Sequence, residues 1–276
     1  MSKTPIFIIN LGIDVEKKAH MEALCEVNKI EAIFIDAVYG KQLSDTAIQR
    51  VYNKELSITE CGRELTLGEL GCTLSHLKIY KQMLAENIEQ AVVLEDDVLL
   101  TPEFLELVSN VSNFPDDYEL MLLGYYADEV TEKRTRSNLW SHHNIVSKLN
   151  ALRLVMPTYG THGYIINNAG AQKLVNELRV IKKPIDHYTG REDYLNMYAL
   201  EQRVVLLDPS YKAMSCIEAE RRELVQSNQD VQTKDKKNPL LKSILRSLHL
   251  FDCGRFIYTT YKQVKFLRAY KKNEHI

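Results

Sequence analysis

Short apolar runs recur along the chain between polar segments, and they predict the strands of a sheet. Residues 5–11 (PIFIINL) are nearly all apolar and rich in β-branched residues, which is typical of a buried strand. Five further runs have a similar character and are expected to be strands: 32–37, 91–94, 119–123, 161–166 and 203–207. The chain therefore contains enough strands for one sizeable sheet.

Apolar residues at helical spacing predict helices between these runs. One helix is expected after Asp14 as N-cap, and a longer one is expected from Thr66 through a turn that contains glycine. The residues expected on their buried faces are Met21, Leu24, Val27, Leu70, Leu74, Leu77 and Met83. Two more helices are expected, one with Thr101 as N-cap and Pro102 in its first turn, and one over 169–180.

The order of these elements predicts an α/β fold. Strand, helix and strand follow one another over residues 5–37 with a short crossover, as in parallel Rossmann-like units. We expect such a domain over residues 1–220, with helices flanking its sheet. Residues 41–65 and 125–155 lack periodicity and are expected to be irregular, the second segment as a loop region over the active face.

The composition changes after residue 220. Residues 221–238 are polar and charged, and we expect a linker there. Residues 239–276 mix apolar residues with Lys and Arg, which is typical of basic amphipathic helices in the interface of anionic membranes. We expect this helical tail to bind the inner face of the cytoplasmic membrane. Packing on the catalytic domain or on a second subunit, in a homodimer, is the alternative.

Composition narrows the class of protein. The 276 residues carry 35 Lys and Arg against 37 Asp and Glu, and a net charge of −2 argues against a nucleic-acid binder. No apolar run approaches the ~20 residues of a spanning helix, and the apolar run among the first ten residues is too short for the core of a signal peptide. The five cysteines are scattered without CxxC spacing, so neither a zinc site nor a disulfide framework is expected. We expect a cytoplasmic enzyme with reduced thiols.

Three carboxylates leave a predicted buried strand together, as Glu95-Asp96-Asp97. Crowded like charges repel one another unless a cation neutralises them, and carboxylate oxygens suit Mn²⁺ or Mg²⁺. Such ions are commonly held together with substrate phosphates, which a sugar nucleotide supplies. A solvated acidic strand end that caps the following turn is the alternative.

Several motifs resemble those of glycosyltransferase family 25. They are TLGELGCTLSH (66–76), VVLEDDVLL (92–100), YGTHGYII (159–166), INL (9–11) and DAVYG (36–40). The resemblance covers about residues 5–210 and is closest to bacterial lipooligosaccharide galactosyltransferases. It implies a GT-A-like fold, with a Rossmann-type mixed sheet, a UDP-sugar donor and Mn²⁺. It also makes Glu95-Asp96-Asp97 the counterpart of the DxD motif, with Asp97 and then Asp96 as metal ligands.

The matched positions imply a donor site. Asn10 and Leu11 end the first strand, where a uridine commonly docks in this fold, although Asn10 would equally suit a local turn. Asp36 ends the second strand, as a ribose ligand or as a turn residue. Ser75 and His76 are expected near the donor, with a buried helix interface as the alternative for His76.

The YGTHG segment is expected to shape the pocket for the donor sugar or the acceptor. The resemblance places Gly160, Thr161 and His162 there, because glycine lets the backbone approach a ligand closely. Tyr159 beside them would stack on a sugar ring or simply lie at the edge of the core.

An inverting transfer needs a general base that accepts the proton of the attacking hydroxyl. Asp186 in KKPID is our first choice, and Asp193 and Glu192 in GREDY are near equals. An N-cap or a surface carboxylate is an equally good account of any one of them.

These observations favour a metal-dependent hexosyltransferase that moves galactose from a UDP-sugar to a lipid-linked surface glycan such as lipooligosaccharide. Two other classes stay open. One is an inactive membrane-associated scaffold of glycan assembly. The other is a metal-dependent phosphatase or nucleotidyltransferase, although the chain has no Gly-rich phosphate loop and its acidic triplet follows the third predicted strand rather than the first.

Overall fold

The computed structural model describes residues 4–126, 142–154, 157–211, 217 and 220–221. These residues belong to the first of two units, residues 1–221. Apart from Arg221, the expected linker over 221–238 and the expected helical tail over 239–276 lie outside the described residues. No described helix is long and apolar enough to cross a membrane.

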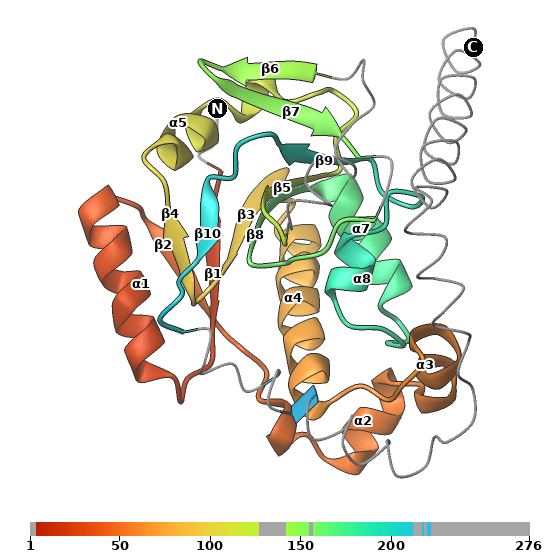
Figure 1. Cartoon of the computed structure of the whole chain (residues 1–276). Coiled ribbons are helices and arrows are strands. Elements are labelled where there is room, and N and C mark those ends of the chain that lie inside the picture. Colours follow the sequence, from red (N-terminus) through yellow and green to blue (C-terminus); the bar gives the residue numbers. More distant parts are fainter. Residues whose placement is uncertain (1–3, 127–141, 155–156, 212–216, 218–219, 222–276) are drawn as a thin grey trace, which may run out of the picture. The chain divides into compact units, whose positions relative to one another are not determined.

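The centre of this unit is an eight-stranded mixed sheet (Figure 1). Its strands, in order across the sheet, are β2 (Ala32–Asp36), β1 (Ile6–Asn10), β3 (Gln90–Glu95), β8 (Gly163–Asn167), β5 (Leu120–Gly124), β9 (Met197–Leu200), β7 (Leu149–Arg153) and β6 (His142–Val146). Strands β2, β1 and β3 are parallel, whereas β8 is antiparallel to both of its neighbours. The expectation of a mixed α/β sheet is confirmed.

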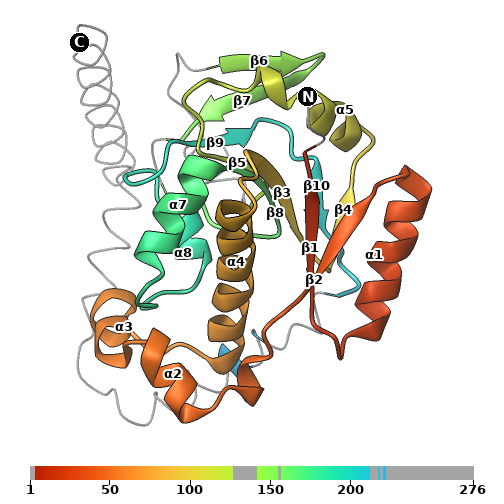
Figure 2. The same ribbon diagram turned by 180° about the vertical axis from the view of Figure 1, so that it is seen from behind.

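Alternate residues of each strand face opposite sides of the sheet, and each side has its own apolar core. Phe7 and Ile9 of β1 belong to the core that includes residues of α4 (Leu67–Ala85) and α7 (Asn168–Glu177). Ile6 and Ile8 belong to the core that includes residues of α1 (Val15–Asn28) and α5 (Glu103–Ser109). Figures 1 and 2 show α4 beside α7, with α1 well apart from them. Helices therefore cover both faces.

Helix α4, expected from Thr66, begins with a capping box. The Thr66 side chain accepts from the backbone N–H of Glu69, and the Glu69 side chain accepts from the backbone N–H of Thr66. Leu70, Leu77 and Met83 are buried as expected. The cap fixes the register of the helix, and hence the direction in which its polar residues point.

Two segments expected to be irregular contain regular structure. Residues 41–65 form α2 (Asp45–Val51) and α3 (Lys54–Cys61), after the 3-10 turn η1 (Gly40–Gln42). These helices are too short to show a repeating apolar face, so their N-caps, Ser44 and Asn53, are the main local signal. The described part of 125–155 contains the antiparallel pair β6–β7, whose outward face is largely polar.

Smaller corrections concern single elements. Val27, expected in the core, is 82% exposed. The strand expected over 203–207 is shorter, β10 (Val205–Leu207), and pairs with β4 (Val98–Leu100) in a separate two-stranded ribbon. This ribbon brings the Asp208 backbone N–H to 2.8 Å from the Asp97 backbone oxygen. The short helix α8 (Asp186–Thr189) begins at one of the expected acidic residues.

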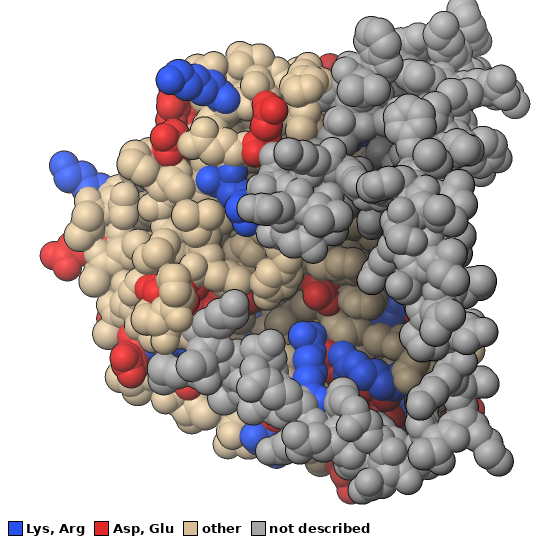
Figure 3. All heavy atoms as spheres, viewed as in Figure 1, with Lys and Arg blue, Asp and Glu red and all other residues tan. Residues whose placement is uncertain are grey.

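On the face shown in Figure 3, the described basic and acidic side chains are interspersed. Ion pairs among the described residues include those of Lys182 and Lys183 with Glu60, at 3.0 Å each. Partly exposed pairs of this kind add little to stability. Their distribution is consistent with the near-neutral composition.

Helix α4 approaches the segment after β2 so closely that Gly71 is expected not to tolerate a side chain. A Cβ on Gly71 would collide with the Val38 backbone oxygen and lie 2.8 Å from the Gly40 backbone nitrogen, neither of which can move independently. Gly71→Ala should lower the free energy of unfolding by about 1–3 kcal/mol. Gly12→Ala is the matched control, because a Cβ there meets nothing within 4 Å. Equal urea midpoints for both variants would contradict this packing.

Candidate functional site

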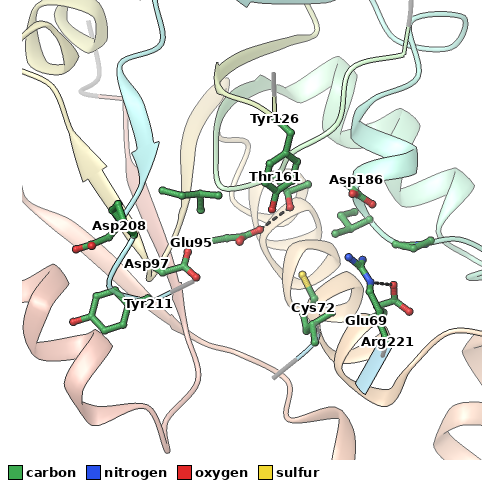
Figure 4. Close-up of a pocket in the computed structure, with 15 residues that line it drawn as sticks. Glu69, Cys72, Glu95, Asp97, Tyr126, Thr161, Asp186, Asp208, Tyr211 and Arg221 are labelled. Atoms are coloured by element: carbon green, nitrogen blue, oxygen red, sulfur yellow. Dashed lines mark hydrogen bonds and ion pairs between the residues drawn. The ribbon is translucent and has the colours of Figure 1, made fainter. Parts of the chain in front are cut away.

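A cavity of about 510 Å³ opens at the carboxyl end of β3. Its lining comes from α4, from the end of β3, from the segment before β8, from α8 and from the segment after β10 (Figure 4). The charged residues that line it are Glu69, Glu95, Asp97, Asp186, Asp208 and Arg221. Five carboxylates and one guanidinium leave an excess of negative charge in the cavity, which a bound cation would reduce.

The antiparallel strand β8 holds Glu95 at the cavity. The Glu95 backbone N–H donates to the His162 oxygen at 3.1 Å, and the Thr161 hydroxyl donates to Glu95 Oε1 at 2.6 Å. Gly160 turns the chain just before them with a φ of +120°, which strongly favours glycine. The YGTHG segment therefore meets the acidic triplet directly.

Asp96 is not among the residues that line the cavity, and it is buried among hydrogen-bond donors. Its Oδ2 accepts from the Asn10 side chain at 2.8 Å, and its Oδ1 accepts from Lys17 Nζ at 3.1 Å. Both oxygens of this expected metal ligand are thus engaged. Asp96 fixes the end of β3 against β1 and α1.

Asp97 lines the cavity. Its Oδ2 accepts from Lys17 Nζ at 3.1 Å, whereas its buried Oδ1 has no hydrogen-bond partner within the described part of the chain. Burial and repulsion by Glu95 raise the pKa of Asp97 to about 6, although Lys17 opposes the shift. Asp97 Oδ1 is therefore a buried carboxylate oxygen that is available to bind a cation.

His76 lies beneath Glu95, fully buried on α4. Its Nδ1 is 2.7 Å from the Tyr164 hydroxyl, and its Nε2 is 3.7 Å from Glu95 Oε1. Burial would raise the pKa of Glu95, but His76 and the Thr161 hydroxyl outweigh it and lower the pKa to about 2. The pKa of Glu95 thus lies below its usual value, and the pKa of Asp97 lies above it.

The other residues that were expected to bind the sugar-nucleotide donor do not line the cavity. Ser75 is buried, donates to the Gly71 oxygen and accepts from the Val38 N–H, so it joins α4 to the segment after β2. Leu11 is partly exposed just after β1, and Asp36 is exposed at the end of β2, two strands from β3. Neither Leu11 nor Asp36 lines the cavity, and their donor-binding roles stay predictions.

The expected bases separate into two places. Asp186 lines the cavity with Glu95 and Asp97; burial raises its pKa, and its Oδ1 has no hydrogen-bond partner among the described residues. Glu192 and Asp193 line a second cavity of about 470 Å³, where Arg191 is 3.3 Å from Asp193. Geometry therefore favours Asp186, and the role itself stays a prediction.

Sequence reasoning missed several lining residues. Arg221 donates to Glu69 Oε1 at 2.7 Å (Figure 4). Glu69 also accepts from both terminal guanidinium nitrogens of Arg63. Glu69 was detectable as the fourth residue of the capping box, whereas Arg221 and Lys17 reach the site only through tertiary folding. Tyr126 and Cys72 also line the cavity.

The model of glycosyltransferase family 25 (LPS biosynthesis protein) matches residues 3–189. The chain belongs to this family. The resemblance stated from the motifs is confirmed, and the matched residues include the acidic triplet, YGTHG and Asp186.

Curated relatives agree with the family. The chain is 30% identical to procollagen galactosyltransferase 1-A of Xenopus laevis over 68% of this chain and 31% of the relative. It is 30% identical to procollagen galactosyltransferase 2 of Homo sapiens over 62% of this chain and 27% of the relative. It is 31% identical to a glycosyltransferase 25 family member of Aedes aegypti over 68% of this chain and 30% of the relative. The chain thus spans about a third of the length of these relatives.

Solved structures show more distant likenesses. One is A197 from STIV, with a TM-score of 0.35, 14% identity, and coverage of 75% of this chain and 94% of that one. Another is a glycosyltransferase involved in the glycosylation of the major capsid of PBCV-1, with a TM-score of 0.31, 8% identity and coverage of 64% and 66%. The family assignment rests on the sequence matches.

The raised pKa of Asp97 predicts that ionisation of this carboxyl group lowers the free energy of unfolding. Because the folded pKa of about 6 exceeds the unfolded value near 3.8, the folded chain loses stability as pH rises from about 4 to 6. Asp97→Asn removes this loss and should be more stable than the native chain at pH 7, by up to about 2 kcal/mol, and not at pH 4. Urea unfolding in EDTA measures it.

The control for this prediction is Asp116→Asn, which removes one negative charge from an exposed turn. It should change stability by less than about 0.5 kcal/mol at either pH. A destabilised Asp97→Asn variant at pH 7 would mean that the Lys17 contact outweighs burial and repulsion, against this account.

Proposed function

We propose that this chain is an inverting hexosyltransferase that transfers galactose from UDP-galactose to a hydroxyl group of a glycan, with the help of a divalent cation. One observation carries the proposal. A single cavity holds a charged Glu95, an Asp97 oxygen without a partner and, on another element, the buried carboxylate of Asp186. Membership of a glycosyltransferase family directs this arrangement toward sugar transfer.

The residues present fit a hard divalent cation such as Mn²⁺ or Mg²⁺. Asp97 Oδ1 is buried, anionic above pH 6 and unpartnered among described residues, and such cations prefer carboxylate oxygens. Asp97 would hold the ion, while Asp96 would support it by keeping Lys17 and Asn10 in place. When bound, the cation supplies stabilisation of the negative charge that develops on a leaving diphosphate.

Asp186 is the proposed general base. Burial raises its pKa, and hence its affinity for a proton, and its Oδ1 is unpartnered in the described structure. The acceptor hydroxyl oxygen attacks the anomeric carbon as Asp186 takes its proton, and the bond from that carbon to the diphosphate oxygen breaks. The products are the extended glycan and UDP, with inversion at the anomeric carbon.

Galactose is proposed because curated relatives are named as galactosyltransferases. A lipid-linked surface glycan such as lipooligosaccharide is the proposed acceptor, in keeping with the family's description as LPS biosynthesis proteins. We further propose a cytoplasmic location at the inner face of the membrane, with the basic segment 239–276 as the contact. Family membership weighs against a phosphatase or nucleotidyltransferase.

The metal assignment predicts a binding defect without loss of fold. Asp97→Ala should weaken Mn²⁺-dependent UDP binding by at least ~10-fold, because it removes the oxygen assigned to the cation. Isothermal titration with Mn²⁺ or with EDTA measures it, with Asp116→Ala as control. Unchanged binding in Asp97→Ala would refute the metal role. Absence of UDP binding in the native chain would favour an inactive scaffold.

The base assignment predicts separate effects on binding and turnover. Asp186→Asn should bind UDP as the native chain does but lose transfer by at least ~100-fold, because no group accepts the hydroxyl proton. Asp193→Asn and Glu192→Gln, in the second cavity, should retain most transfer. The measurement is UDP release in the presence of acceptor. Near-normal turnover by Asp186→Asn would assign the base elsewhere.

A further inference from the structure

Three potential metal ligands of different chemistry meet at the floor of the cavity. Cys72 and His76 are four residues apart on α4, so their side chains lie on one face of that helix, one turn apart. Glu95 reaches the same place from the end of β3. One ligand atom from each residue lies within 4.8 Å of the other two.

His76 is the decisive member. It is fully buried, and its Nε2 has no hydrogen-bond partner in the described structure. Glu95 Oε1 is 3.7 Å away, which is beyond hydrogen-bond distance but within ion-pair distance of a protonated imidazole. A buried nitrogen without a partner is costly unless something else satisfies it, and a cation between Nε2 and the carboxylate would do so.

A hydrogen-bonded pair of tyrosines orients the imidazole. His76 Nδ1 is 2.7 Å from the Tyr164 hydroxyl, which is 2.6 Å from the Tyr80 hydroxyl, and both tyrosines are fully buried. A bound ion would take the place of the Nε2 proton that otherwise faces Glu95; with its remaining proton on Nδ1, His76 donates to Tyr164 and directs the Nε2 lone pair toward the ion. Metal-binding histidines are commonly held in this way through their other ring nitrogen.

We propose that Cys72, His76 and Glu95 bind a borderline-soft divalent cation such as Zn²⁺. Thiolate, imidazole and carboxylate together are a zinc-type set, and bond lengths near 2.0–2.3 Å place tetrahedral ligands roughly 3.3–3.6 Å apart. The 3.7 Å between His76 and Glu95 is close to that spacing. Thiolate and carboxylate balance the charge of the ion, and the Cys72 thiol proton passes to solvent.

This site differs from the one proposed at Asp97. Asp97 offers oxygen alone, which suits Mn²⁺ or Mg²⁺, whereas a sulfur ligand selects Zn²⁺ or Co²⁺. Cys72 and Glu95 both line the cavity, and the Cys72 sulfur points into it (Figure 4). Three protein ligands leave a fourth position that opens toward the space proposed for substrates, as in catalytic rather than structural zinc sites.

Cobalt titration of the full metal-free chain tests this site. Co²⁺ should produce a thiolate-to-cobalt charge-transfer band in the near ultraviolet, and Zn²⁺ should abolish it by displacement, whereas Mn²⁺ should not. Cys72→Ser should lose the band, and Cys25→Ser, which alters a buried thiol elsewhere, should keep it. Absence of the band in the native chain, or its persistence in Cys72→Ser, would overturn the proposal.

Two further measurements separate a site from a folding defect. Tyr164→Phe, which keeps all three ligands, should weaken Co²⁺ binding by roughly 10–100-fold. X-ray absorption of the zinc-loaded native chain should show one sulfur neighbour for each zinc, and a shell without sulfur would refute the site whatever the variants do. Asp97→Ala should retain the cobalt band, so failure here is distinguishable from failure of the Mn²⁺ site.

Discussion

The burial of three consecutive carboxylates at the end of one strand is the constraint on which this structure depends. Each carboxylate meets it differently. Glu95 receives the Thr161 hydroxyl and lies above His76, Asp96 is enclosed by Asn10 and Lys17, and Asp97 shares Lys17 but retains one unpartnered oxygen within the described structure. One ammonium group partly neutralises the cluster, and the remaining charge is what a cation would neutralise.

The sheet topology makes this arrangement possible. If β3 had only parallel neighbours, its carboxyl end would meet other carboxyl ends, and the donors of YGTHG would lie at the opposite edge. Because β8 runs antiparallel between β3 and β5, its amino end reaches the cavity, and His162 and Thr161 bond Glu95 there. Thus one reversed strand joins two motifs that lie more than sixty residues apart.

Sequence could predict those parts of the fold and the site that depend on local sequence patterns. Apolar runs predicted β1, β2, β3, β5, β8 and part of β10, the helical pattern after Thr66 predicted α4, and the acidic triplet with YGTHG indicated the family. The position of β8 in the sheet has no local signature, because strand order depends on packing between distant segments. For the same reason, sequence favoured Asp186 only slightly over Asp193, whereas the fold places them in different cavities. Lys17 and Arg221 gave no signal either. A search for CxxC spacing does not detect the proposed site of Cys72 and His76, because the third ligand, Glu95, comes from a strand.

The central claim is that the cavity beside Glu95 and Asp97 handles a sugar nucleotide with a divalent cation. The most direct measurement is UDP release by the native chain with a panel of UDP-sugars and Mn²⁺, with and without EDTA. The account predicts turnover with UDP-galactose that EDTA abolishes. Turnover that is indifferent to EDTA would contradict the role given to Asp97, and turnover with a different UDP-sugar alone would contradict the donor.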